Sequence, residues 1–144
     1  MDGASAAEFA LVLPLLLMFL IGIIDVGRLM WEWNQAEKAT QMGVRFAVST
    51  DMVPTGLASY SFTTNNAVPQ GDPVPESQFG GATCSSSGGT VTCACNAGAT
   101  CPTLTPASSA AFNNIVNRMQ NFLPDITANR VTVEYGYSGL GFAG

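Results

Sequence analysis

Histidine is absent from this 144-residue sequence, and charged residues are scarce. Asp, Glu, Lys and Arg make up only 10% of the positions, against about a quarter in a typical soluble domain. Without histidine, Ser-His-Asp and Cys-His catalysis and the usual His-containing zinc sites are excluded. The net charge of −5 argues against binding to nucleic-acid phosphates. We therefore expect no enzyme, no metal or cofactor, and no nucleic-acid partner.

The longest apolar run is residues 9–24, FALVLPLLLMFLIGII, which contains no charge. Small residues from Ala4 and the single acid Glu8 extend it to about the 20 residues that span a bilayer. A secretory signal peptide is disfavoured, because no basic segment precedes the run and no small-residue cleavage site follows Ile24. The sequence predicts an uncleaved single-pass helix that spans the membrane over about residues 6–27.

Charge and cysteine content give opposite orientations for this helix. Arg28, Lys38 and Arg45 follow the apolar run, which by the positive-inside rule places the C-terminal side in the cytoplasm. Four cysteines cluster in a Gly/Ser/Thr-rich segment, which indicates disulfides in an oxidising compartment. They are Cys84, Cys93, Cys95 and Cys101. We follow the cysteines and expect the domain after the helix to lie on the extracytoplasmic, oxidising side of the membrane.

Helical periodicity continues beyond the apolar run to about Thr50, which predicts one helix over residues 4–50. Its second half carries small residues at three- and four-residue steps. They are Ala36, Ala39, Gly43 and Ala47. Small side chains let another backbone approach closely, so we expect this stripe to be a helix-packing face. Trp31 and Trp33 are expected to lie at the membrane interface.

Residues 51–144 are predicted to form an extracytoplasmic α+β domain with a Cys-rich loop at 84–101. Strands are expected at 59–64 and 90–94, with a hairpin turn in Ser85–Gly89. Three disulfide connectivities are possible. The spacing favours Cys84–Cys93 with Cys95–Cys101, and disfavours most the pattern that joins Cys93 to Cys95.

A helix is expected to begin at Thr105 as N-cap with Pro106 in the first position, and to stop at Pro124. Its apolar face is Phe112, Ile115, Val116, Met119, Phe122 and Leu123. We expect this helix to pack on a strand at 130–135 and on the second half of the first helix. The glycine-rich end is predicted to lack a finishing element, with further strands beyond it.

No catalytic constellation is present, and the most informative acid is Glu8. A lone carboxylate inside an apolar helix costs about 2–3 kcal/mol on insertion scales, which makes it a functional candidate. The alternative is a structural position at the headgroup boundary, where this cost is small.

The run GASAAEFALVLPLLL, from Gly3, resembles the start of the TadE/TadG-like pseudopilins of the tight-adherence (Flp) type IV pilus system. The resemblance covers about residues 3–28. It implies cleavage by a prepilin peptidase between Gly3 and Ala4, which makes residues 1–3 the remnant of a leader. Glu8 is then the fifth residue of the product and, with Phe9, the implied subunit-pairing group. A buried carboxylate needs a partner, and the α-amino group of Ala4 on a neighbouring subunit supplies one.

The resemblance implies a minor pilin that supports pilus assembly and surface adhesion. The implied partners are other pseudopilins, the major pilin and the inner-membrane assembly platform. Two alternatives remain open. One is a membrane-anchored extracytoplasmic binding protein unrelated to filaments, and the other is a membrane-tethered enzyme whose active site lies beyond Gly144.

Overall fold

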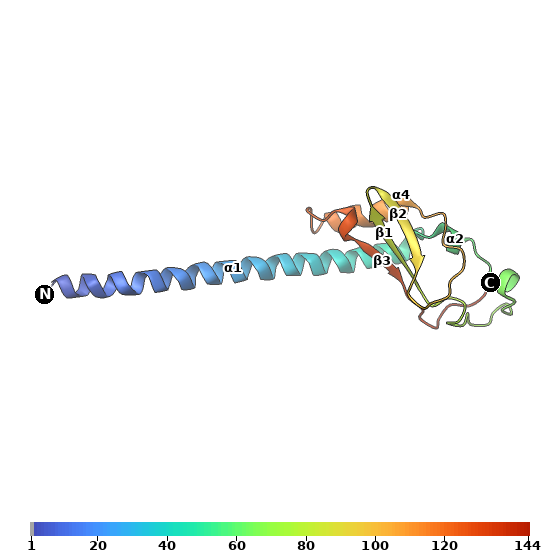
Figure 1. Cartoon of the computed structure of the whole chain (residues 1–144), viewed down its shortest axis with the longest axis horizontal. Helices are drawn as coiled ribbons and strands as arrows, with labels where there is room; N and C mark the ends of the chain where they lie inside the picture. Colours follow the sequence, from blue (N-terminus) through green and yellow to red (C-terminus); the bar gives the residue numbers. More distant parts are fainter. Residues whose placement is uncertain (1) are drawn as a thin grey trace. The chain divides into compact units, whose positions relative to one another are not determined.

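The computed structural model describes the backbone of residues 2–144 and the side chains from Ala7 onward. It confirms the predicted class, a long N-terminal apolar helix followed by a small α+β domain (Figure 1). The first helix, α1, runs without interruption over Asp2–Ser49. Contacts between residues divide the chain into two compact units, Met1–Lys38 and Ala39–Gly144. The last turns of α1 therefore belong to the same unit as the sheet.

A three-stranded antiparallel sheet forms one layer of the unit 39–144. The strands are β1 (Ala82–Ser87), β2 (Thr90–Cys95) and β3 (Thr132–Tyr135), in the order β2-β1-β3. Gly88 and Gly89, with φ of 57° and 85°, make the two-residue turn between β1 and β2. This confirms the predicted hairpin and the strand at 90–94. The central strand β1 was missed because its sequence, ATCSSS, has almost no apolar signal.

Small side chains of β1 alternate between the two faces of the sheet. Ala82 and Cys84 are fully buried, whereas Ser85 and Ser87 are exposed. In the register, Cys84 stands opposite Cys93 of β2 and opposite Val133 of β3. Because successive side chains of a strand point to opposite faces, one face of the sheet is the core face.

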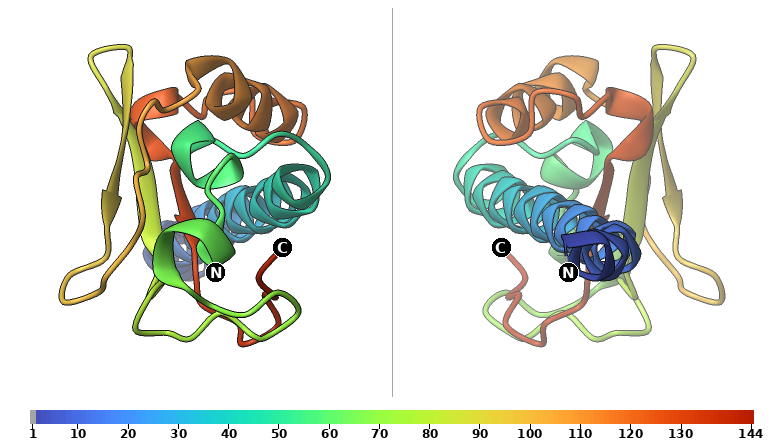
Figure 2. Two further views of the ribbon diagram at one scale, coloured as in Figure 1. Left: turned by 90° about the vertical axis from the view of Figure 1, so that its right-hand side faces the viewer. Right: turned by 90° about the vertical axis from the view of Figure 1, so that its left-hand side faces the viewer.

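The helix α4 (Ser109–Gln120) and the last turns of α1 lie on the same side of the sheet (Figure 2). The predicted apolar face of α4 is confirmed. Its buried residues are Ala111, Phe112, Ile115, Val116 and Met119. They form the main core together with Ala39 of α1, Val53, Val91 and Val131. The helix therefore packs as its 3.6-residue periodicity indicates.

The strand predicted at 59–64 is wrong, because one short helix ends just before this region and another begins within it. They are α2 (Thr55–Ala58) and α3 (Phe62–Asn66). Aromatic and β-branched residues there suggested a strand, but the Ser61 hydroxyl accepts a hydrogen bond from the Thr64 N–H and caps α3. Serine side chains compete with strand pairing by bonding to nearby backbone groups.

The predicted N-cap at Thr105 is also wrong, since the Ser108 hydroxyl accepts from the Ala111 N–H at 3.1 Å. The residues before Ser108 are paired elsewhere. The Pro106 carbonyl accepts from the Thr55 N–H at 3.0 Å, and the Ser108 N–H donates to the Val53 carbonyl at 2.7 Å. This pairing holds the segment extended, so α4 begins later than the local sequence indicates.

No helix or strand follows β3 (Thr132–Tyr135) in the described chain, but the last residues are paired with a distant segment. After a short 3-10 helix, η1 (Ala128–Arg130), and β3, the chain returns to pair with residues 71–74. The Val74 N–H donates to the Gly141 carbonyl at 2.8 Å, and the Ala143 N–H donates to the Asp72 carbonyl at 2.9 Å. Ala143 is buried in a second small core with Val68 and Val74.

Candidate assembly surfaces

The first candidate surface is the apolar part of α1. From Ala7 onward this helix is long and apolar enough to cross a membrane. All described side chains from Ala7 to Asn34 are exposed, including Glu8, Phe9, Trp31 and Trp33. Such a surface in water is an interaction site for lipid or for other helices. Gly3 and Ala4, the predicted processing site, precede the residues whose side chains are described.

The predicted small-residue stripe is divided between the two units, with Ala36 in the first and the other three residues in the second. Ala39 is fully buried and Gly43 is buried. A Cβ at Gly43 would lie 2.8 Å from Cγ of Met119 and 3.8 Å from Cγ2 of Ile115. The partner that approaches α1 here is therefore α4 of the same chain, as the predicted packing of that helix requires.

Replacing Gly43 by valine is expected to lower the free energy of unfolding of the unit 39–144 by about 1–3 kcal/mol, because the new side chain overlaps Met119. Gly43→Ala should cost less, since alanine favours the helix by about 1 kcal/mol. The measurement is tyrosine near-UV circular dichroism of the full chain in detergent. All three tyrosines lie in this unit, whereas both tryptophans precede Ala39.

A double variant tests the cause. In the Met119→Ala background the contact is gone, so Gly43→Val should cost much less than it does alone. An equal cost in both backgrounds would contradict the proposed contact with Met119.

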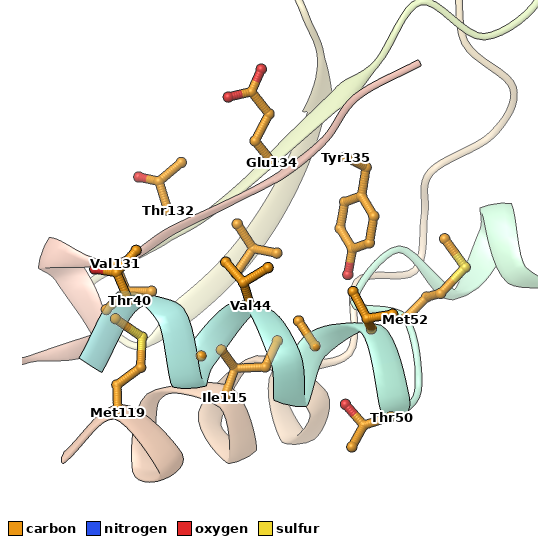
Figure 3. A pocket seen from close by; sticks show the side chains of 14 residues that line it. Thr40, Val44, Thr50, Met52, Ile115, Met119, Val131, Thr132, Glu134 and Tyr135 are labelled. Carbon is orange, nitrogen blue, oxygen red and sulfur yellow. The ribbon is translucent and has the colours of Figure 1, made fainter. Parts of the chain in front are cut away.

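The second candidate surface is an open groove in the unit 39–144, between α1 and β3 (Figure 3). Its volume is about 370 Å³. Val44, Ala47 and Val48 line it from α1, and Ile115 and Met119 line it from α4. Val131 and the four residues of β3 form the other side. In the close-up, Tyr135 points toward the helix and Glu134 points away from it. Val44 and Val48 are 58% and 83% exposed, so this apolar lining is accessible.

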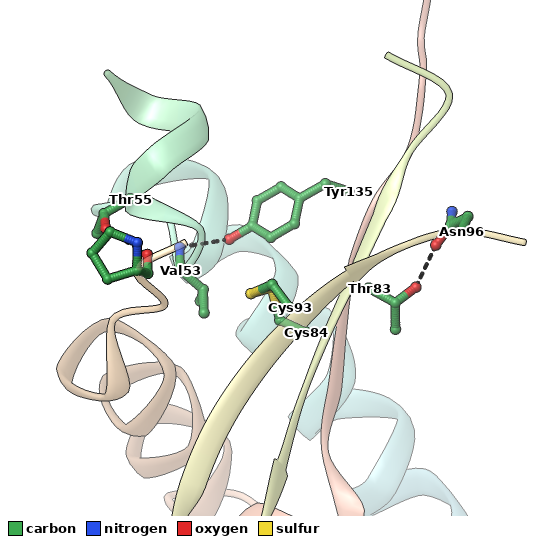
Figure 4. Close-up of a disulfide and its surroundings, with 8 residues drawn as sticks. Val53, Thr55, Thr83, Cys84, Cys93, Asn96 and Tyr135 are labelled. Atoms are coloured by element: carbon green, nitrogen blue, oxygen red, sulfur yellow. Dashed lines mark hydrogen bonds between the residues drawn. A yellow bond between two sulfur atoms is a disulfide. The ribbon is translucent and has the colours of Figure 1, made fainter. Parts of the chain in front are cut away.

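A partly buried hydrogen bond supports one end of the groove (Figure 4). The Val53 N–H donates to the phenolic oxygen of Tyr135 at 3.0 Å. Val53 is fully buried and would otherwise leave this donor without a partner. Sequence reasoning missed the contact because the two residues are 82 positions apart. The only local signal was the tyrosine at the end of a half-buried strand, whose hydroxyl needs a partner when buried.

Two disulfides crosslink β1 to β2 and β2 to the loop that follows it. They join Cys84 to Cys93 and Cys95 to Cys101, the pairing that the spacing favoured. The first links two directly opposed residues of β1 and β2, and Cys84 is fully buried (Figure 4). The second closes the loop after β2. Beside it, the Thr83 hydroxyl donates to the side-chain carbonyl of Asn96.

The residues of these two surfaces are suited to binding a partner. Within the described part of the chain, no three His, Cys, Asp or Glu side chains gather to hold a metal ion. The groove is lined by apolar and hydroxyl groups and one carboxylate, Glu134, whose side chain points away from α1. Both surfaces are suited to apolar partners: lipid or helices for α1, and a short apolar segment for the groove.

The fold and these surfaces define a class of protein, in which a helix able to cross a membrane carries a small disulfide-containing α+β domain. Residues 3–45 match the model of a protein family described as TadE-like protein, and the match lies wholly within α1. The match confirms the resemblance found in the sequence for this part of the chain. No curated protein and no solved structure matches the chain.

Proposed function

We propose that this chain is a minor pilin that takes part in assembly of a Tad (Flp) pilus and thereby supports surface adhesion. The observation that carries the proposal is the family match over residues 3–45, which covers both the Gly3-Ala4 junction and the exposed apolar helix. A helix with its side chains exposed on all sides requires lipid before assembly and other helices after it. The same segment thus serves as membrane anchor and as assembly surface.

In this proposal the anchor lies in the bacterial inner membrane and the unit 39–144 lies in the periplasm. The two disulfides favour that side, because disulfides persist in oxidising compartments. The partners are the major pilin, other pseudopilins and the assembly platform in the inner membrane. Prepilin peptidase acts first, between Gly3 and Ala4.

Glu8 has the central role in pairing. In an apolar helix a carboxylate is costly unless a cation meets it. Removal of residues 1–3 creates an α-amino group on Ala4, and this group on a neighbouring subunit pairs with Glu8. The pairing sets the register between adjacent helices. In any other register the Glu8 carboxylate and the Ala4 α-amino group would both lie unpaired in an apolar environment.

The N-terminus of the protein from native membranes tests the processing step. Mass spectrometry should find an N-terminus at Ala4 in cells with the peptidase and an uncut leader in cells without it. An uncut leader in both strains would contradict the minor-pilin proposal. It would favour a membrane-anchored binding protein, for which another membrane helix in place of residues 4–27 keeps full function.

Glu8→Gln is expected to lower the amount of chain that co-purifies with pilus components about ten- to a hundredfold. A charge-assisted hydrogen bond contributes about 1.5–3 kcal/mol, and each 1.4 kcal/mol is a factor of ten. Asp25→Asn is the matched control, because it neutralises another exposed acid of the same helix. Equal losses in the two variants would mean that Glu8 has no special pairing role.

A further inference from the structure

The groove between α1 and β3 offers two kinds of interaction at once. Its wall is apolar, and Val48 at its rim is 83% exposed. The strand order places β1 on one side of β3, and no strand of the described chain pairs with its other edge. An open strand edge beside an apolar groove is the arrangement to which an extended segment adds as a further strand, with alternate side chains in the groove.

A segment with matching properties follows β3 directly in the sequence. We call residues 136–143 the tail segment; they contain no charged residue. Leu140 and Phe142 are 78% and 66% exposed, while Ala143 is buried. Since residues two apart in an extended chain point to the same side, Leu140 and Phe142 form one apolar projection.

The inner edge of the tail segment is already occupied. The Gly141 carbonyl and both backbone groups of Ala143 are hydrogen-bonded to residues 71–74. Backbone groups of alternate residues point to opposite edges of an antiparallel strand, so those of Phe142 point away from that segment. The tail segment therefore has a free outer edge and a fixed position in its own chain.

We propose that the tail segment of one copy binds in the groove of a second copy. Leu140 and Phe142 enter between Val44, Val48 and β3, and the outer edge of the tail segment pairs with the open edge of β3. Both surfaces lie in the unit 39–144, and neither places a charged side chain in the contact, because Glu134 points away from α1. Burial of the two large apolar side chains supplies the main driving force.

The contact is heterologous, because the groove and the tail segment are different surfaces. One such contact leaves the groove free on one copy and the tail segment free on the other, so the contact propagates into an open chain instead of a closed dimer. This inference goes beyond the proposed function and does not depend on cleavage at Gly3.

The test is photocrosslinking of the full chain in detergent, with p-benzoylphenylalanine in place of Phe142. This substitution keeps an aromatic group at an exposed position, so the fold is retained. Irradiation should give a covalent dimer whose crosslink maps by mass spectrometry to residues 40–52 or 131–135. The same photoreactive residue at exposed Asn113 of α4 is the matched control and should give no such product.

A groove variant completes the test. Val48→Asp places a charge at an exposed position of the groove and should lower the crosslinked dimer about tenfold or more. Asn113→Asp should leave it unchanged. A tail-to-tail crosslink, a dimer insensitive to Val48→Asp, or crosslinking in membranes only to a different protein would each overturn the proposal. The N-terminus of the same sample is determined separately by mass spectrometry. It distinguishes failure of processing at Ala4, which bears on the proposed function, from failure of the contact between copies.

Discussion

Phe112→Ala is expected to lower the free energy of unfolding of the unit 39–144 by about 3–5 kcal/mol, a large share of the stability of a small domain. The Phe112 side chain is fully buried and belongs to the main core, together with residues of the sheet and of the last turns of α1. Its removal leaves a cavity that a sheet crosslinked by the Cys84–Cys93 disulfide cannot readily close. Tyrosine near-UV circular dichroism of the full chain during urea unfolding gives the measurement.

Asn113→Ala is the matched control for this prediction. Asn113 is the next residue of α4, but its side chain is exposed. A surface substitution of this kind changes the free energy of unfolding by about 0.5 kcal/mol or less. If both variants lost stability equally, the assignment of the Phe112 face as the core face of α4 would be wrong.

Replacing Cys84 and Cys93 together by alanine is expected to cost about 3–4 kcal/mol of unfolding free energy, and replacing Cys95 and Cys101 about 2 kcal/mol. The chain-entropy model gives similar terms of about 2–3 kcal/mol for two such short loops. The difference comes from burial, because Cys84 is fully buried whereas Cys95 is exposed. Loss of the sulfur at Cys84 therefore also leaves a small cavity.

The two double variants serve as controls for each other, since each removes two cysteines and one crosslink. Both should be measured in the full chain, with free thiols counted to establish that the remaining disulfide has formed. A larger cost for the Cys95 and Cys101 pair would contradict the assignment of Cys84 to the core. Reduction of the wild-type protein should destabilise the unit by about the sum of the two entropic terms.

These predictions bear on assembly, because the core and the groove share residues. Ile115 and Met119 belong to the core and also line the groove. A variant that loosens α4 is therefore expected to weaken the proposed contact with the tail segment of a second copy as well as lower stability. Val48→Asp changes only an exposed position, so it separates the two effects.

Several features of the chain followed from local sequence alone, because they depend on residues close together. The apolar run of residues 9–24 is sufficient for a long helix, since its backbone bonds are internal and its side chains suit lipid. The 3.6-residue spacing of Phe112, Ile115 and Met119 marked the buried face of α4. The glycines at 88 and 89 marked a hairpin turn, and that turn brings Cys84 opposite Cys93.

Other features required the tertiary structure, because their determinants are distant in sequence or locally weak. The central strand β1 consists of small and polar residues, so its own sequence gives little strand signal. It forms a strand because it pairs with a neighbouring strand on each side. The start of α4 depends on pairing of residues 106–108 with residues 53–55, which no local pattern indicates. The tail segment is ordered by residues 71–74 for the same reason. Local sequence thus determined the anchor and the amphipathic helix, whereas only long-range hydrogen bonds and packing decided where the groove and the tail segment lie.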